Sequence, residues 1–152
     1  MSDVKAKTPY GEMTIDQLAD IQPGMATLMK EVGERFTETY YAAKGGNWKL
    51  AAHHLNQLRF AFRTAKVTRP KFADDLTAFD QEYLTPIFKA IRDQNWAEFE
   101  AAFRRGEVGS DTYHDKRGYP HIRYVLPNEG LSNLYRGPPE KFNRDAAASE
   151  SG

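Results

Sequence analysis

Three short breaks divide residues 23–118 into four long stretches, and each stretch repeats apolar side chains every three or four residues. The breaks are Gly45-Gly46-Asn47, Arg69-Pro70 and Gln94-Asn95. A repeat of this length places the apolar side chains on one face of an α-helix. Glycine, proline and asparagine favour helix ends, with asparagine as the N-cap. Turns this short favour antiparallel neighbours, so we predict an all-α, up-down-up-down antiparallel four-helix bundle. Its helices are expected over residues 23–44, 47–67, 70–94 and 95–118.

The N-terminal segment and the third helix depart from this regular pattern. Residues 1–13 are polar and are expected to be loose. Thr14 and Gln17 have the spacing of a capping box, which predicts a short helix within the N-terminal segment 1–22. Pro86 falls inside the third helical repeat and removes a backbone hydrogen bond there. We therefore expect a kink or a break near residues 82–85.

Residues 119–152 are expected to form a C-terminal arm instead of another bundle helix. Glycine and proline interrupt this segment repeatedly, yet it also carries tyrosine, leucine and phenylalanine. Such a segment is too apolar to be wholly free of contacts. Residues 121–126 are therefore predicted to pack over the bundle as an extended chain. The arm is expected to cover either the open end of the bundle, called its mouth below, or a partner subunit. Residues 146–152 are small and polar and are expected to be disordered.

The composition excludes several classes of function. Lysine plus arginine and aspartate plus glutamate each total 21, so no net field attracts nucleic acid or an acidic membrane surface. The chain contains no cysteine, which excludes disulfides, thiolate metal sites and thioether-linked cofactors. No stretch has the apolar length of a signal peptide or a membrane span. These features favour a cytoplasmic protein without a nucleic-acid or membrane partner.

The fourth helix changes character along its length, and its polar end is the best candidate for a site. It begins with Trp96, Phe99 and Phe103 and ends with Tyr113 and His114. In the predicted topology this end lies beside the start of the first helix, the end of the second and the start of the third. An imidazole where a bundle core opens could act as a general acid or base, or ligate haem iron. The alternative is a histidine that merely caps the helix end.

Two arginines of the second helix are candidates for binding an anionic group. Arg59 and Arg63 lie one turn apart and could clamp a carboxylate or a phenolate. Alternatively, they form a solvated face paired with Asp74 or Asp75.

Further candidates are aromatic, apolar or imidazole side chains near the bundle interior. His53 and His54 are adjacent, so they cannot both face inward, and no helix carries the Glu-x-x-His or His-Glu-x-x-His spacing of a metal site. We therefore predict no metal. Ordinary core packing is the alternative role for the tyrosines. The residues predicted to contact a ligand are Arg63, Met29, Phe62, Phe79, Tyr83, Tyr40 and His54.

A histidine at the end of the last helix, under a mouth formed by the other three, resembles the cytochrome c′-like four-helix bundles. In that family the last helix carries Cys-x-x-Cys-His and the haem lies in the mouth. Residues 35–50 are also similar to a stretch of bacterial cytochrome-like proteins of this build, sharing the arginine, the aromatic pair and the Asn-Trp. The resemblance covers roughly residues 25–127. Ser110 and Tyr113 stand where the family has cysteines, and only His114 remains. The resemblance therefore implies a bundle that has lost covalent haem.

Three functional hypotheses follow. The first is a cofactor-independent enzyme, a lyase or an isomerase, acting on a small aromatic or phenolic compound in the vacated mouth. In it Arg59 holds an anionic group, and His114 or Tyr113 moves protons; retro-aldol-like loss of a small carbonyl is one example. The second is a protein that binds haem b noncovalently with His114 as axial ligand. The third is a non-catalytic binding homodimer, because bundles of this family tend to pair through the first helix.

Overall fold

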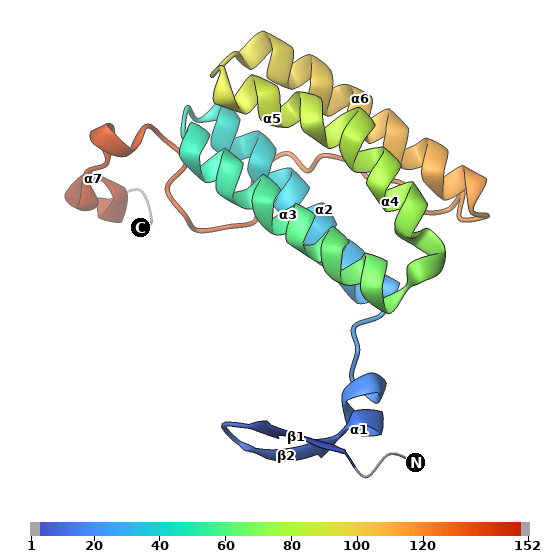
Figure 1. Cartoon of the computed structure of the whole chain (residues 1–152). Helices are drawn as coiled ribbons and strands as arrows, with labels where there is room; N and C mark the ends of the chain where they lie inside the picture. The colour runs from blue at the N-terminus through green and yellow to red at the C-terminus, as the bar shows by residue number, and fades with distance from the viewer. Residues whose placement is uncertain (1–3, 150–152) are drawn as a thin grey trace.

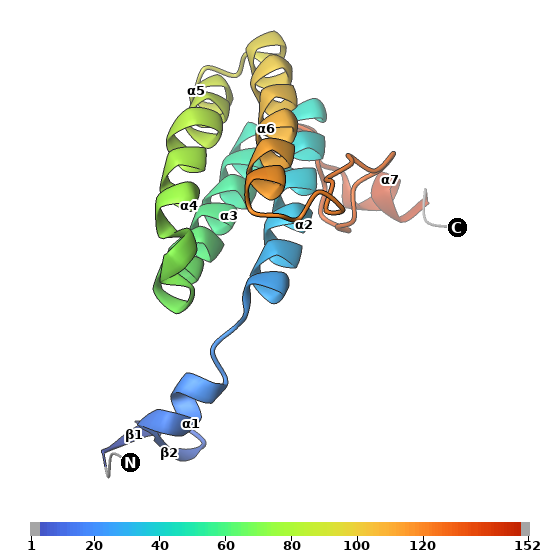
Figure 2. The same cartoon turned by 90° about the vertical axis from the view of Figure 1, so that its right-hand side faces the viewer.

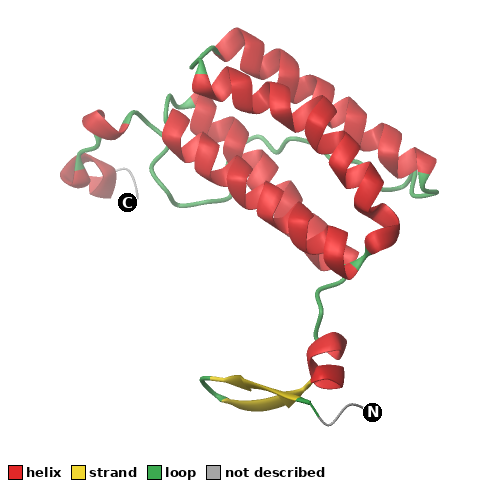
Figure 3. Cartoon of the chain, viewed as in Figure 1, coloured by secondary structure: helices red, strands yellow, loops and turns green. Residues whose placement is uncertain are grey.

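The computed structural model describes residues 4–149 and is mostly helical, with one small two-stranded sheet. Figures 1 and 3 show the large helices lying side by side. Helix α2 packs along α3, α3 packs against α4 and α5, and α6 packs against α5 and α2. No helix in residues 4–149 is long and apolar enough to cross a membrane. The large helical segments are α2 (Met25–Lys44), α3 (Trp48–Thr68), α4 (Ala73–Phe79), a π-helix (Asp80–Leu84), α5 (Thr85–Arg92) and α6 (Trp96–Lys116).

The ends of these helices form as the capping residues predict. The Asn47 side chain accepts a hydrogen bond from the backbone N–H of Leu50, and Asn95 does the same for Glu98, each at 3.1 Å. Each asparagine satisfies one backbone donor that has no partner inside its helix. After α2 the chain turns at Gly46, whose φ of +85° lies in the left-handed region that glycine tolerates.

The third helical stretch is irregular where Pro86 predicts a disturbance, although it is not a single kinked helix. It opens with a 3₁₀ turn, Pro70–Phe72, and α4 and α5 are separated by the π-helix Asp80–Leu84. Proline has no N–H, and its ring would clash with the carbonyl of Glu82 in a regular α-helix. The wider π turn avoids that clash and keeps the helical rod continuous.

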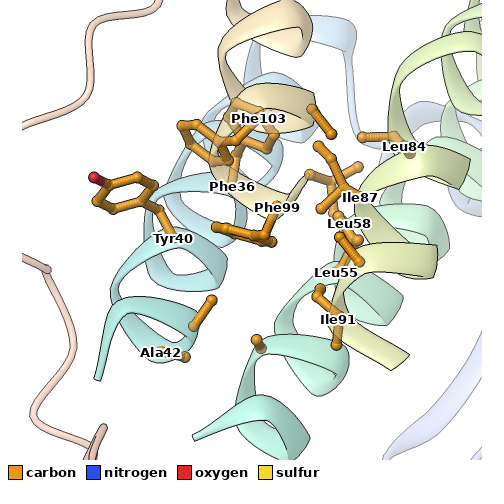
Figure 4. Packing of buried hydrophobic residues seen from close by; sticks show 14 of the residues in the cluster. Phe36, Tyr40, Ala42, Leu55, Leu58, Leu84, Ile87, Ile91, Phe99 and Phe103 are labelled. Atoms are coloured by element: carbon orange, nitrogen blue, oxygen red, sulfur yellow. The ribbon is translucent and has the colours of Figure 1, made fainter. Parts of the chain in front are cut away.

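The core lies between α2, α3, α5 and α6. Leu55, Ile87 and Phe99 are fully buried, and the ring of Phe36 stacks on Phe103 with centroids 4.0 Å apart. Figure 4 shows these side chains meeting between the helices. Burial of each large apolar side chain stabilises the fold by about 1.5–3 kcal/mol. The buried residues of α6 run from Phe99 to Gly109, so the last turns of this helix lie at the margin of the core.

The N-terminal segment contains a β-hairpin where a loose chain was expected. Strands β1 (Lys5–Thr8) and β2 (Gly11–Thr14) pair antiparallel, and the Thr8 hydroxyl donates to the carbonyl of Gly11 across the turn. The predicted capping box of Thr14 is present at the start of α1 (Ile15–Asp20). In Figures 1 and 2 the hairpin and α1 stand apart from the large helices.

The C-terminal arm runs back along α2, as its apolar content predicts. Tyr124 packs edge-on against Phe36 and its hydroxyl lies 2.9 Å from that of Thr37. Farther along, the buried carboxylate of Glu38 accepts hydrogen bonds from two backbone N–H groups of the arm and from Arg136. These contacts fix the arm to the second half of α2.

The end of the arm is more ordered than its composition predicts. A 3₁₀ turn, Pro139–Lys141, is followed by α7 (Arg144–Ser149). The Asn143 side chain accepts hydrogen bonds from the backbone N–H groups of Asp145 and Ala146 and so caps this helix. The segment predicted to be disordered, 146–152, overlaps α7 up to residue 149, and residues 150–152 lie outside the described residues.

Candidate functional site

The main candidate site is an apolar cavity of about 460 Å³ at the end of α6. This volume falls within the range of small-molecule pockets, roughly 300–1,000 Å³. The cavity is bounded by the start of α2, the end of α3, the start of α4, the end of α6 and the first part of the arm. The helix ends predicted to share one layer with His114 therefore do meet. The lining residues include Met25, Met29, Val32, Phe62, Phe72, Leu76, Phe79, Ser110, Tyr113, His114, Tyr119 and Ile122.

Five of the predicted site residues line this cavity. His114 and Tyr113 come from α6, Met29 from α2, Phe62 from α3 and Phe79 from α4. The Phe79 ring centroid lies 5.9 Å from that of Phe62 and 5.9 Å from that of Tyr113. The three rings form a continuous aromatic wall, which is a surface suited to a flat apolar molecule.

His114 is the side chain in the cavity best suited to acid–base chemistry or to metal ligation. It is partly buried, and its Nδ1 lies 3.5 Å from the Ser110 hydroxyl. Burial lowers the pKa of His114 below its usual value, against the opposing effect of the Asp111 carboxylate. The imidazole is therefore neutral at pH 7. A neutral imidazole can accept a proton or ligate a metal ion, and an imidazolium can do neither.

The two arginines expected to clamp an anion do not line the cavity. Arg59 donates to the Asp80 carboxylate at 2.8 Å and to the Thr85 hydroxyl at 3.2 Å, and its guanidinium lies over the Phe88 ring. It ties α3 to the π-helix and α5, so its Nε and Nη2 groups are used within the fold. Arg63 is exposed and lies over Phe60 instead. The predicted partners Asp74 and Asp75 pair with neither of them.

Tyr83 and Tyr40, which were predicted to contact a ligand, pack into the protein instead. The ring of Tyr83 lies against the backbone of Gly109 and 5.1 Å from the Phe79 ring, behind the cavity wall. Tyr40 is buried among the core aromatics, with its hydroxyl 3.4 Å from a carboxylate oxygen of Glu100. Tyr40 follows the alternative prediction of core packing, whereas Tyr83 is half-buried and packs between Phe79 and α6 outside the core cluster.

His54 is separated from the cavity and contacts a second, smaller pocket of about 240 Å³ between α2, α3 and the arm. Its Nδ1 lies 3.1 Å from Nη1 of Arg35. A guanidinium only donates, so Nδ1 accepts and Nε2 carries the proton. Nε2 is buried and has no hydrogen-bond partner in the described part of the chain. Burial, and then the charge of Arg35, lower the pKa of His54, which is therefore neutral.

Cations at the mouth of the cavity were not predicted as ligand contacts. Arg69, Lys71 and Arg117 line it together with one carboxylate, Asp75. Arg117 and Lys116 both pair with Asp75, and the Arg117 hydrogen bond is the main cause of a lowered Asp75 pKa. A sequence signal for the other two was available, because Arg69 and Lys71 flank the proline that separates two helical stretches facing the mouth.

Among residues 4–149 no group of three or more histidine, aspartate or glutamate side chains is arranged to hold a metal ion. No protein-family model, curated protein or solved structure matches this chain. The cytochrome c′-like resemblance therefore stays a prediction, and function must be argued from the cavity itself.

Proposed function

We propose that the cavity at the end of α6 binds a small flat aromatic compound and that the chain acts on it as a cofactor-independent lyase or isomerase. The observation that supports this most directly is the combination of an apolar cavity, an aromatic wall and one neutral imidazole on the same side. The framework that we propose is the up-down-up-down four-helix bundle, with α4, the π-helix and α5 together as its third member.

In the proposed chemistry His114 is the general base and then the general acid. In an isomerisation it takes a proton from a carbon next to the ring and returns that proton to another atom of the same molecule. In a retro-aldol-like step it takes the proton of a side-chain hydroxyl. The adjacent C–C bond then breaks as the carbonyl forms, and the electron pair left on the departing carbon is protonated by the imidazolium. Tyr113, also in the cavity, donates a hydrogen bond to the oxyanion that develops.

A second candidate function is noncovalent binding of haem b, and the same cavity supports it. His114 is neutral and could serve as axial ligand, and the rings of Phe62, Phe79 and Tyr113 give apolar walls for the macrocycle. The cationic side chains at the mouth suit haem propionates. Bound haem would supply redox or gas-binding chemistry, whereas the protein residues would supply the ligand and the walls.

A titration with haemin, followed by absorption in the Soret region, separates the two functions. Haem binding predicts a new Soret band that His114→Phe abolishes and His53→Gln retains, because His53 is exposed on α3. The enzyme proposal predicts no His114-dependent band. It also predicts that a thermal-shift screen of phenolic compounds finds stabilising ligands for the wild type and not for Met29→Trp, which fills the cavity. If neither haemin nor any phenol binds, both proposals fail and a non-catalytic homodimer is left.

A further inference from the structure

The mouth of the α6 cavity is electropositive, although the chain as a whole is neutral. Three cationic side chains line it, Arg69, Lys71 and Arg117, against the single carboxylate of Asp75. The whole chain has 21 basic and 21 acidic residues, so this excess is a local arrangement. An apolar cavity with a rim of one charge sign concentrates the field at its opening and attracts ligands of the opposite sign.

Two of these cations have no acidic partner in the described part of the chain. Arg117 is paired with Asp75 at 2.5 Å. No carboxylate of residues 4–149 lies within ion-pair distance of Arg69 or Lys71. Within residues 4–149, Arg69 donates one hydrogen bond, from Nη1 to the carbonyl of Thr68 at 2.6 Å. A guanidinium offers five N–H donors, so most of those of Arg69 are free for a ligand.

The position of these cations is set by the junction between α3 and α4. Arg69 ends α3, and Lys71 lies in the 3₁₀ turn that follows. Their neighbour Phe72 also lines the cavity. The Lys71 ammonium lies 4.8 Å from its ring centroid, and the guanidinium carbon of Arg117, the residue that follows α6, lies 5.6 Å from it. Phe72 therefore contacts two of the cations, of which Lys71 is exposed, whereas Phe62 of the aromatic wall is buried.

We propose that the ligand of this cavity is an aromatic acid, whose anionic group is bound at the mouth by Arg69 and Lys71. Its ring then lies inward, against Phe62, Phe79 and Tyr113. This inference rests on the proposed function, because it names the class of compound that the same cavity takes. It assigns to Arg69 and Lys71 the anion-binding role that the sequence suggests for Arg59, which the fold uses to bind Asp80. A planar guanidinium and a carboxylate have matching hydrogen-bond geometry.

The test uses three probes of the same shape and different charge: 2-naphthoate, 2-naphthalenemethanol and 2-naphthylmethylamine. Calorimetric titration of the full chain should show that the carboxylate binds about tenfold more tightly than the alcohol, and the amine most weakly, because a charge-assisted hydrogen bond at a partly exposed site contributes about one power of ten. The carboxylate's advantage should shrink in high salt. Arg69→Gln and Lys71→Gln should each reduce it, whereas Arg92→Gln, whose side chain is exposed on α5, should not.

The outcomes separate this inference from the proposed function. Equal affinities for the three probes would overturn the aromatic-acid assignment while leaving an aromatic cavity. An unchanged preference for the carboxylate in both Gln variants would overturn the anion-binding role of Arg69 and Lys71. Failure of all three probes to bind would overturn the binding function itself. Lys71 is exposed, so Lys71→Gln keeps the test valid even if Arg69→Gln unfolds the chain.

Discussion

Replacing Gly109 by alanine should destabilise the fold more than any other glycine-to-alanine change in the large helices. A Cβ atom at position 109 would lie 2.5 Å from two ring carbons of Tyr83. Contact between carbon atoms is favourable only at about 3.5–4.0 Å, so the ring would have to move by about 1 Å. The ring is rigid, and Phe79 packs against it with centroids 5.1 Å apart. Neighbouring packing must therefore give way as well.

The expected magnitude follows from two opposing effects. Alanine stabilises a helix interior by about 0.5–1 kcal/mol relative to glycine. Overpacking costs about 1–3 kcal/mol, and three ring carbons within 2.8 Å place Gly109→Ala at the upper end. The net loss should be about 2 kcal/mol. Gly33 in α2 is the matched control, because a Cβ there meets nothing within 4 Å, and Gly33→Ala should gain about 0.5–1 kcal/mol.

Urea titration of the three proteins, followed by circular dichroism, measures these differences directly. Gly106→Ala gives an intermediate point, since its Cβ would lie 3.2 Å from the tip of Phe36, and its stability should stay close to that of the wild type. In a double-mutant cycle, Tyr83→Ala should recover most of the loss caused by Gly109→Ala. The reasoning is refuted if Gly109→Ala is as stable as Gly33→Ala. It is also refuted if the losses in free energy of unfolding caused by Tyr83→Ala and Gly109→Ala simply add in the double variant.

Two further predictions concern buried titratable side chains. Burial lowers the pKa of His54 below 6.5, so below that pH the unfolded chain binds more protons than the folded chain, and stability rises with pH. The free energy of unfolding should fall as the pH drops from about 7.5 through 6.5, less steeply in His54→Gln than in His53→Gln; identical slopes would contradict this. Glu38→Ala removes the buried carboxylate that binds the arm, and because its partner Arg136 is partly exposed the loss should be about 1–3 kcal/mol. Limited proteolysis should then cut residues 128–138 rapidly, while the exposed control Glu34→Ala stays resistant; equal rates would show that Glu38 does not hold the arm.

Local signals in the sequence account for the helix ends and for the position of the cavity. Asn47 and Asn95 cap their helices through contacts three residues away, and such contacts depend on nothing distant in the chain. Short turns between long helices then decide which ends meet. Consequently His114 could be placed beside Met29, Phe62 and Phe79 before the structure was known.

The contacts of side chains at the margins of each apolar helix face could not be predicted from the sequence in the same way. A helical repeat defines an apolar face but does not fix how a marginal residue is oriented toward its neighbour. Arg59 is oriented by Asp80, which belongs to the π-helix. The π turn holds one more residue than an α turn, so every side chain around it changes direction by a large fraction of a turn. Pro86 predicted a disturbance near this point, but the periodicity could not predict its form.

The β-hairpin was missed because its residues lack the usual strand pattern. Residues 5–8 and 11–14 are mostly polar and do not alternate with large apolar side chains. The only signal was the turn itself, in which Thr8 bonds to the backbone of Tyr10 and Gly11. Turn chemistry of this kind identifies a reversal of the chain, but it does not show that the flanking residues pair.

The change in side-chain size along α6 explains why a cavity exists at this end of the protein. The helix begins with Phe99 and Phe103, which fill the core, and continues with Gly106, Gly109 and Ser110. The two glycines admit the rings of neighbouring helices, and Ser110 leaves space beside His114. A large residue at position 110 would narrow the cavity, whereas large residues at positions 106 and 109 would strain the packing against Phe36 and Tyr83. Small residues in the second half of α6 therefore allow close packing at two positions and, at Ser110, leave the space in which His114 and Tyr113 could act.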